Sequence, residues 1–239
     1  MTVENLRTKG HYEGRRTCRS WQQKQKHKYL LFDMDGTLLD SMFLWHMLIE
    51  DYLDTHGYLV TEEMRRDMSY MRVGEVAQQL HETCLPEQTT DEIIHSIYAF
   101  MKQRYEDVTV KTGVVEFLQQ CRDEGKVMAV VTATARELAL PVLKRLELDQ
   151  YFDLFLSTKD IGIDKLQPDI YVQAARELGA KSNHEAAVFE DAPYALKTAA
   201  EAGFYTILLD DPVFREEQAD YIHLADEYYM SMEELLDRE

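Results

Sequence analysis

A short apolar run that ends at two carboxylates is the feature that most constrains this chain. Residues 29–32 read Tyr-Leu-Leu-Phe, and Asp33 and Asp35 follow at once, before the turn-forming Gly36. A short apolar run bounded by turn residues predicts a buried β-strand. In open parallel sheets, ligands bind just beyond the carboxyl ends of the strands. Asp33 and Asp35 are therefore predicted to lie where such a sheet does its chemistry.

Strands and helices alternate from residue 113 to the end of the chain. This alternation predicts an α/β fold with a parallel sheet and right-handed crossovers. A last weak strand is expected near Tyr221 and Ile222, followed by a helix over 230–237. The apolar runs that predict the other strands cover 127–131, 152–156, 187–189 and 205–209, and the predicted helices lie between them.

Residues 41–107 interrupt this α/β pattern. Apolar side chains recur there at helical spacing, Pro86 breaks the run, and no convincing strand is present. The predicted helices cover 42–56, 61–71, 74–83 and 90–105. We interpret the block as a small helical module inserted after the first strand. The expected organisation is a core of residues 29–40 and 108–239 with a helical cap of residues 41–107.

Residues 1–28 differ in composition from the rest. They hold eight Lys or Arg and two Glu, with few large apolar side chains. Such a segment is typical of a disordered tail. The alternative is a basic arm that touches nucleic acid or another anionic partner.

Charge and cysteine content exclude several classes of protein. A formal net charge of −18 argues against general nucleic-acid binding, which needs clustered Lys and Arg. Three widely separated cysteines form no disulfide framework or zinc motif and suit a reducing, cytoplasmic setting. No apolar run approaches the roughly 20 residues that span a bilayer. We therefore expect a cytoplasmic protein with no membrane partner.

Polar groups follow four successive strands of the predicted sheet. The carboxyl ends of parallel strands share one edge, so these groups are predicted to meet there. Their carboxylates repel, because like charges about 4 Å apart cost on the order of 4 kcal/mol at an effective dielectric near 20. The groups are Asp33 with Asp35, Thr132, Lys165 on a following loop, and Glu190 with Asp191.

Such an edge requires cations. Lys165 supplies one positive charge, and a divalent metal is the predicted second. A ligand set of oxygens with few protein ligands suits Mg²⁺, which keeps waters and engages substrate phosphate. A carboxylate nucleophile, a second carboxylate for proton transfer, a lysine, a hydroxyl and a metal together favour phosphoryl transfer through an acyl phosphate.

These residues resemble the motifs of the haloacid dehalogenase (HAD) superfamily of hydrolases. Residues 33–38, Asp-Met-Asp-Gly-Thr-Leu, look like the first motif, and residues 130–132, Val-Val-Thr, like the second. Residues 164–171, Asp-Lys-Leu-Gln-Pro-Asp-Ile-Tyr, are similar to the third, and residues 189–203 to the fourth. The resemblance implies a Rossmann-like, three-layer α/β/α core around a parallel sheet. The helical insert is similar to that of the subfamily with an α-helical cap.

The resemblance also implies catalytic roles. Asp33 attacks phosphorus and forms an aspartyl phosphate, while Asp35 protonates the leaving oxygen and then takes a proton from water. Thr132 and the backbone N–H of Ala133 bind phosphoryl oxygens. Lys165 neutralises Asp33 and the transferring group.

For the metal, the resemblance implies a Mg²⁺ site with four contributors. Asp33, the carbonyl of Asp35, and Asp191 hold the ion, and Glu190 lies near it. An acid at the position of Asp35 favours phosphate chemistry, because the dehalogenases of the superfamily lack one there.

The sequence thus predicts a Mg²⁺-dependent phosphatase that acts on a small phosphorylated metabolite. Arg72 is a candidate for binding a substrate anion, with a solvated helix arginine as the alternative reading. Two other functions stay open: a phosphomutase of the β-phosphoglucomutase type, and a non-catalytic binding or regulatory protein on the same fold. The sequence leaves the substrate, the oligomeric state and the purpose of the basic tail undetermined.

Overall fold

The chain forms two compact units. The computed structural model describes residues 27–61, 64, 68, 71 and 73–236. One unit runs to Asp40 and resumes at Thr109, and we call it the core unit. The other, Ser41–Val108, we call the helical unit. Most of the basic segment 1–28, most of the helix expected over 61–71, and Arg72 lie outside the described residues.

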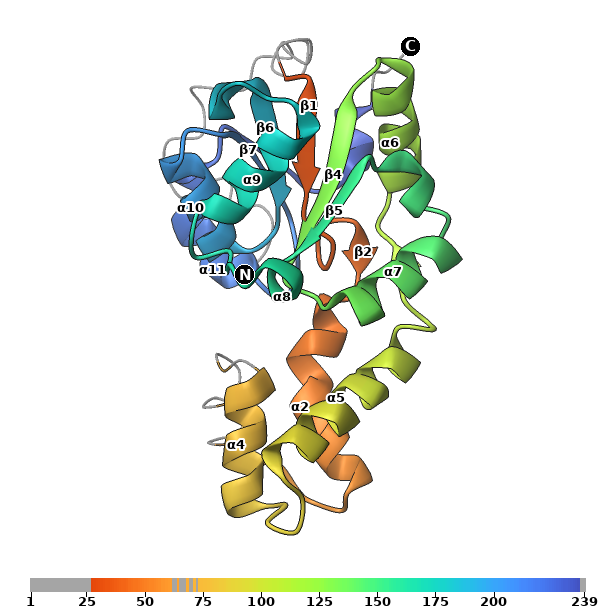
Figure 1. Cartoon of the computed structure of the whole chain (residues 1–239), viewed down its shortest axis with the longest axis vertical. Helices are drawn as coiled ribbons and strands as arrows, with labels where there is room; N and C mark the ends of the chain where they lie inside the picture. The colour runs from red at the N-terminus through yellow and green to blue at the C-terminus, as the bar shows by residue number, and fades with distance from the viewer. Residues whose placement is uncertain (1–26, 62–63, 65–67, 69–70, 72, 237–239) are drawn as a thin grey trace. The chain divides into compact units, whose positions relative to one another are not determined.

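A six-stranded sheet forms the centre of the core unit, in the order β5-β4-β1-β6-β7-β8 (Figure 1). Neighbouring strands are parallel in all five pairings of this sheet. The predicted α/β fold with a parallel sheet is therefore confirmed. The strands are β1 (Tyr29–Phe32), β4 (Val127–Thr132), β5 (Leu154–Ser157), β6 (Ala186–Glu190), β7 (Tyr205–Leu209) and β8 (Glu227–Tyr229).

β1 lies inside the sheet because all four of its residues are apolar and buried. Leu31 faces Ala129 of β4 on one side and Val188 of β6 on the other. The chain first adds β4 and β5 beside β1 and then crosses over to add β6, β7 and β8 on the far side. In α/β proteins, ligands bind beyond the carboxyl ends of the strands at the point where the strand order reverses in this way.

Helices cover both faces of the sheet and complete three layers. On one face, Tyr171 and Ala199 share a buried cluster with Leu31. On the other face, Phe117 packs edge-on against Phe32, with ring centroids 6.3 Å apart. Leu31 and Phe32 serve opposite layers because successive strand residues point to opposite faces. The helices are α6 (Val114–Asp123), α7 (Arg136–Arg145), α8 (Thr158–Ile161), α9 (Asp169–Leu178), α10 (Pro193–Glu201) and α11 (Arg215–Tyr221), with 3₁₀ turns η3 (Asp149–Tyr151), η4 (Asn183–Glu185), η5 (Ile222–Leu224) and η6 (Met232–Leu235).

A short antiparallel ribbon marks where the chain leaves and re-enters the core unit. It pairs β2 (Leu39–Asp40) with β3 (Thr109–Val110). Before β2 the chain reverses at Gly36, whose φ of 86° lies in the left-handed region that favours glycine. The Gly36 N–H donates to the carbonyl of Leu39 at 2.9 Å. The ribbon was absent from the sequence prediction because two-residue strands carry no readable alternation.

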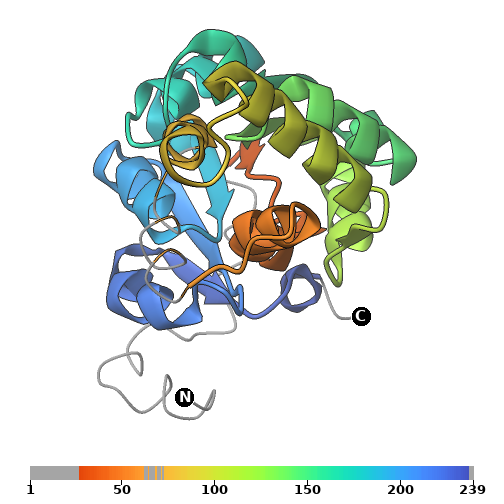
Figure 2. The same ribbon diagram turned by 90° about the horizontal axis from the view of Figure 1, so that it is seen from below.

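The helical unit contains α2 (Met42–Thr55), α4 (Val73–Thr83) and α5 (Thr90–Arg104), and its described residues include no strand (Figures 1 and 2). Its buried side chains are mainly apolar, such as Ile93 and Ile97 of α5. A capping box begins α5: the Thr89 hydroxyl accepts from the Glu92 N–H, and the Glu92 carboxylate accepts from the Thr89 N–H at 2.8 Å.

Two predictions near the C-terminus were wrong. Tyr221 and Ile222 end α11 and begin η5, and the final strand is β8. β8 escaped prediction because its buried Glu227 accepts hydrogen bonds from two tyrosine hydroxyls, so the segment does not read as apolar. The helix expected over 230–237 is the single turn η6, in which the i, i+3 spacing of the 3₁₀ turn buries both Met232 and Leu235.

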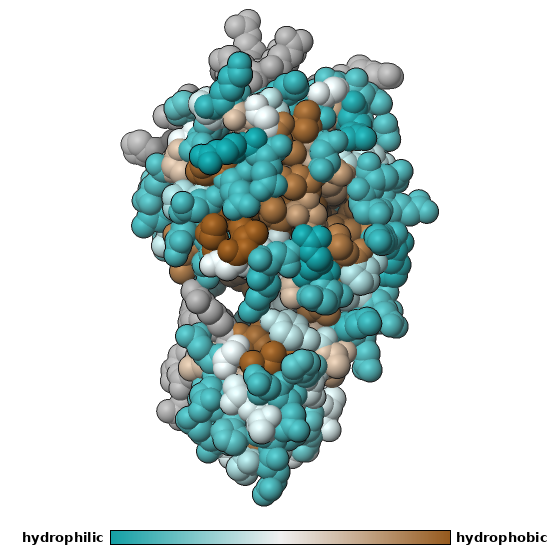
Figure 3. All heavy atoms as spheres, viewed as in Figure 1, coloured by the Kyte–Doolittle hydropathy of each residue, from teal (hydrophilic) through white to brown (hydrophobic). Residues whose placement is uncertain are grey.

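Figure 3 shows one face of each unit, coloured by hydropathy. Teal side chains predominate on the face of each unit seen in Figure 3. Among the described residues, every helix is too short or too polar to cross a bilayer.

Candidate active site

The carboxyl ends of β1, β4 and β6 and the loop after β5 bring the predicted site residues together. Asp33 directly follows β1, Thr132 ends β4, and Glu190 ends β6 with Asp191 next to it. Lys165 comes from the loop between α8 and α9 and still reaches the end of β1. Residues that the sequence separates by up to 158 positions therefore share one edge of the sheet.

Lys165 joins two buried carboxylates. Its ammonium donates to Asp33 Oδ1 and, at 2.7 Å, to Glu190 Oε1. Tyr171 of α9 donates its hydroxyl to the same Glu190 oxygen at 2.7 Å. Burial alone lowers the pKa of Lys165, but the charges of Asp33 and Glu190 outweigh it, so the pKa is raised overall. Lys165 is therefore a fixed cation at the centre of the site.

Asp33 is poised to change its protonation state near neutral pH. Burial raises the pKa of its carboxyl to about 7; Lys165 lowers this pKa, while Glu190 and Asp35 raise it. Desolvation opposes the negative charge, and Lys165 compensates for only part of that cost. A further cation at this position would complete the compensation and keep Asp33 ionised.

Three carboxylates lie close enough to share such a cation. Ligand atoms of Asp33, Glu190 and Asp191 all fall within 4.8 Å of one another, and all three residues are buried. Burial, followed by the charges of Asp33 and Glu190, raises the pKa of Asp191 well above its usual value, while Lys111 lowers it. These acidic residues were predicted to meet at the sheet edge. Their ligand atoms are close enough for one cation to contact all three.

The two carboxylate oxygens of Asp191 have different surroundings. Its Oδ1 accepts a hydrogen bond from the Thr37 hydroxyl at 3.1 Å. Its Oδ2 is buried and has no hydrogen-bond partner within the described part of the chain. Leaving a buried carboxylate oxygen unpaired is costly. The oxygen-rich donor set and this oxygen fit a hard divalent cation.

Asp35 is placed differently from the three clustered acids. It is half-buried, and its Oδ2 accepts a hydrogen bond from the Thr134 hydroxyl at 2.6 Å. Its side chain does not belong to the cluster formed by Asp33, Glu190 and Asp191. Proton transfer by this carboxylate and metal ligation through the Asp35 carbonyl oxygen both stay predictions.

The end of β4 supplies the predicted phosphate-binding groups. Thr132 is buried, and its Oγ1 accepts from the Thr134 N–H at 3.0 Å. Ala133, between them, is exposed. The turn therefore fixes the Thr132 hydroxyl while leaving Ala133 at the surface of the site. Phosphate binding by these two residues is a prediction that the geometry permits.

Sequence reasoning gave no role to three residues that the structure places at the site. Thr37 holds Asp191, Thr134 holds Asp35, and Tyr171 holds Glu190. Thr37 and Tyr171 lie inside the quoted motifs, and Thr134 stands two positions after Thr132. A hydroxyl beside each motif acid was the available signal, but only the tertiary structure pairs each donor with its acceptor.

Comparison with known proteins places these motifs in a family. The family model of the haloacid dehalogenase-like hydrolases matches residues 27–203 of the sequence. A phosphoglycolate phosphatase from Rhodobacter capsulatus is 32% identical over 156 residues, covering 62% of this chain and 70% of the relative. A pyrophosphatase PpaX from Halalkalibacterium halodurans is 26% identical over 212 residues, and the match covers 87% of this chain and 94% of the relative.

Solved structures agree on the fold. The crystal structure of CbbY from Rhodobacter sphaeroides in complex with phosphate has a TM-score of 0.72 at 21% identity, and the match covers 87% of this chain and 96% of that one. At this identity the likeness shows the fold alone. The family model, in contrast, spans all four motifs. The chain therefore belongs to the haloacid dehalogenase-like hydrolases, as its motifs predicted, and is an enzyme of that family.

Proposed function

We propose that this protein is a Mg²⁺-dependent phosphatase that hydrolyses a small phosphorylated metabolite through an aspartyl phosphate. The observation that carries the proposal is the buried cluster of Asp33, Glu190 and Asp191, in which Lys165 bridges Asp33 and Glu190 and one Asp191 oxygen has no hydrogen-bond partner among the described residues. The proposed nucleophile thus lies against a fixed cation, and its ligand oxygen lies within 4.8 Å of those of the other two carboxylates.

In the first step, a carboxylate oxygen of Asp33 bonds to phosphorus as the bond from phosphorus to the leaving oxygen breaks. Asp35 gives its proton to that leaving oxygen. The Thr134 hydroxyl, which donates to Asp35 Oδ2 at 2.6 Å, orients the carboxyl for the transfer. The Lys165 ammonium stabilises the charge that develops on the phosphoryl group.

In the second step, water attacks phosphorus and Asp35 accepts its proton. The bond between phosphorus and Asp33 then breaks, which restores both carboxyl groups and releases inorganic phosphate. Thr132 and the N–H of Ala133 hold phosphoryl oxygens throughout. Asp33, Asp191 and the Asp35 carbonyl would hold Mg²⁺, with Glu190 nearby, and the bound ion would supply charge neutralisation and orientation of the phosphoryl group.

The substrate class rests on the relatives and on charge. The matched relatives are named for phosphoglycolate and pyrophosphate. A chain of formal net charge −18 repels polyanions at long range. We infer a small phosphorylated substrate that the local cations of the site can neutralise. A cytoplasmic setting stays part of this proposal.

Phosphate release from a panel of phosphorylated metabolites, with and without Mg²⁺, tests the proposal. The panel contains phosphoglycolate, pyrophosphate, sugar phosphates and nucleotides. We expect release from at least one compound, its loss on adding EDTA and its return with excess Mg²⁺. Isomerisation of glucose 1-phosphate without phosphate release would instead identify a phosphomutase. If neither phosphate release nor isomerisation occurs with any compound of the panel, the assignment as a phosphatase is wrong.

A further inference from the structure

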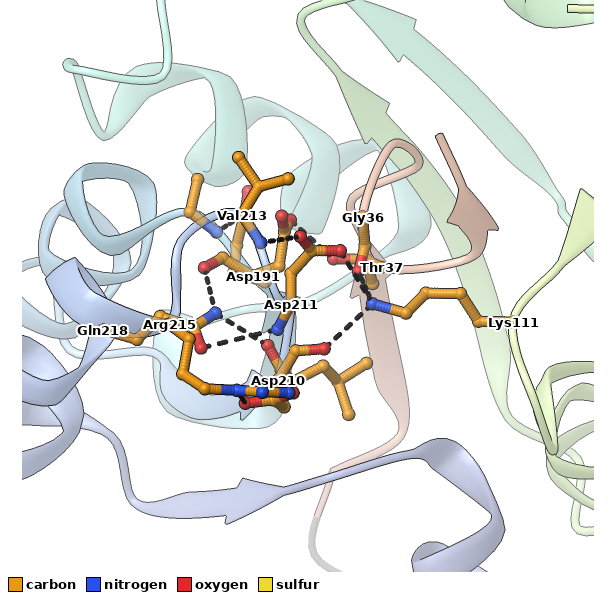
Figure 4. Close-up of polar contacts among 12 residues, drawn as sticks. Gly36, Thr37, Lys111, Asp191, Asp210, Asp211, Val213, Arg215 and Gln218 are labelled. Atoms are coloured by element: carbon orange, nitrogen blue, oxygen red, sulfur yellow. Dashed lines mark hydrogen bonds and ion pairs between the residues drawn. The ribbon is translucent and has the colours of Figure 1, made fainter. Parts of the chain in front are cut away.

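A largely buried polar cluster outside the predicted catalytic residues contacts the main chain of Asp191, a predicted metal ligand. It consists of Lys111, which follows β3, Asp211, which follows β7, and Gln218 of α11, and we call it the brace (Figure 4). Sequence analysis gave none of the three a role. All belong to the core unit.

Gln218 contacts the metal ligand itself. Its side-chain amide donates to the carbonyl of Asp191 at 2.6 Å and to that of Leu209 at 2.9 Å. Only 2% of Gln218 is exposed. A buried amide that bridges two carbonyls fixes their separation, because breaking either bond leaves a polar group without a partner. Gln218 thus ties the end of β6 to the end of β7.

The three oxygens of Asp191 each have a different environment. Gln218 holds the main-chain oxygen, and Thr37 holds Oδ1. Oδ2 is left buried without a hydrogen-bond partner from the described residues. With the backbone and one carboxylate oxygen fixed, the direction of the remaining oxygen is also fixed. Gln218 and Thr37 together therefore set where a cation must lie to bind Oδ2.

Lys111 ties the loop after β1 to the same frame. Its ammonium donates to the carbonyl of Gly36 at 2.6 Å, to the carbonyl of Asp210 at 2.9 Å and to Asp211 Oδ2 at 3.1 Å. These bonds use all three N–H groups of the ammonium. The other oxygen of Asp211 accepts from the Val213 N–H at 3.0 Å. Gly36 follows Asp35, so Lys111 fixes the segment that carries a predicted metal-binding carbonyl.

We propose that Gln218 and Lys111 are positioning residues of the metal site, which hold Asp191 and the Asp35–Gly36 segment at the separation that a divalent cation requires. The inference rests on the proposed Mg²⁺ site. Residues outside the coordination sphere that orient a ligand typically account for 10–100-fold in metal affinity. Both residues act through main-chain carbonyls of their neighbours, Gln218 through that of Asp191 and Lys111 through that of Gly36.

The decisive variant is Gln218→Met, which keeps length and neutrality but removes the amide. Its matched control is Asn183→Leu. Asn183 Nδ2 also donates to a backbone carbonyl, that of Ala202 at 2.8 Å, but it lies in η4 before β6, at the opposite end of that strand from Asp191. Each full-length variant is titrated with MgCl₂ by calorimetry, and its Tm is measured with and without Mg²⁺.

We expect Gln218→Met to weaken Mg²⁺ binding about tenfold and to reduce the rise in Tm that Mg²⁺ produces. Asn183→Leu should lower the Tm without Mg²⁺ and bind Mg²⁺ as the wild type does. Equal Mg²⁺ affinity in Gln218→Met and the wild type overturns the inference. Absence of Mg²⁺ binding by the wild type contradicts the proposed metal site instead, so the two failures are distinguishable.

Lys111→Met provides a second test, which also serves if Gln218→Met does not fold. Removing a positive charge near a cation site strengthens cation binding if charge alone matters. Loss of positioning weakens it. We expect weaker Mg²⁺ binding by severalfold, and tighter or unchanged binding would refute a positioning role for Lys111.

Discussion

The carboxyl edge of the sheet and the helical unit are built by different means. At the sheet edge, Asp33, Lys165 and Asp191 are buried and held by long-range contacts. In the helical unit, the ion pair between Arg104 and Asp51, at 2.8 Å, has side chains that are 43% and 31% exposed. All the buried charged side chains that the structure describes belong to the core unit.

This difference separates residues that serve chemistry from residues that serve packing. Buried charges cost stability unless each is paired, so a fold retains a cluster of them where the charges have a use. Exposed ion pairs and helix caps contribute little each. We therefore expect substitutions at the sheet edge to change activity strongly, and equivalent substitutions in the helical unit to change stability slightly.

The largest contrast should come from the same chemical change made in both regions. Asp33→Asn removes the proposed nucleophile and should lower kcat by at least about 10³-fold, because no covalent intermediate can form. Asp51→Asn in the helical unit should leave kcat within about twofold, because its carboxylate is partly exposed. Phosphate release by the two purified variants checks both. Near-normal turnover by Asp33→Asn would remove the basis for the mechanism.

The second contrast uses pH in the metal-free protein. The pKa of Asp33 is about 7 in the folded state and near 4 in the unfolded chain. Between these values the folded protein holds a proton that the unfolded chain has released, so the free energy of unfolding decreases as pH rises. From pH 5 to pH 8 this loss is about 3 kcal/mol.

Asp33→Asn isolates this contribution from the other acids of the chain. In EDTA, the fall in Tm from pH 5 to pH 8 should be greater for the wild type than for the variant by about 5–10 °C. Saturating Mg²⁺ should remove most of the difference by favouring the ionised carboxylate. Equal pH dependence in both proteins would show that Asp33 titrates normally.

A smaller effect at the sheet edge tests the support for Glu190. Tyr171→Phe removes the hydroxyl that donates to Glu190 Oε1 at 2.7 Å while keeping the ring buried. We expect activity at limiting Mg²⁺ to fall about tenfold, because groups that orient metal-site carboxylates contribute at that level. A Mg²⁺ titration of activity measures it. If the Tm falls but the Mg²⁺ titration of activity is unchanged, the Tyr171 hydroxyl contributes to stability alone and does not support the metal site.

The smallest effect belongs to the helical unit. Thr89→Ala removes the hydroxyl half of the capping box at the start of α5. Loss of such a cap costs about 1 kcal/mol, which lowers Tm by about 2–4 °C in a chain of this size. Thermal unfolding followed by circular dichroism checks this. A shift as large as that of a buried-charge variant would break the contrast between the two regions.

Some elements were readable from sequence because their signals are local. The apolar residues of β1 predicted a buried strand, and the acids after β1 and β6 predicted a shared sheet edge. β8 was missed because it contains a buried acid, Glu227. The Glu227 carboxylate accepts hydrogen bonds from the hydroxyls of Tyr205 in β7 and Tyr229 in β8, and the sequence pattern does not show these contacts. The ribbon of β2 and β3 was missed because its strands hold two residues each.

The α/β class, the family and the chemical groups available at the strand ends are all readable from the amino-acid sequence alone. Periodicity and motif spacing are local properties, so they can be read without knowing which distant residues are in contact. Which oxygen of each acid accepts a hydrogen bond depends on how distant segments pack in the folded protein. Asp35 is held by Thr134, Asp191 by Thr37 and Gln218, and these partners lie 99, 154 and 27 positions away in the chain. Hydrogen bonds between distant segments depend on packing geometry, which no local pattern records.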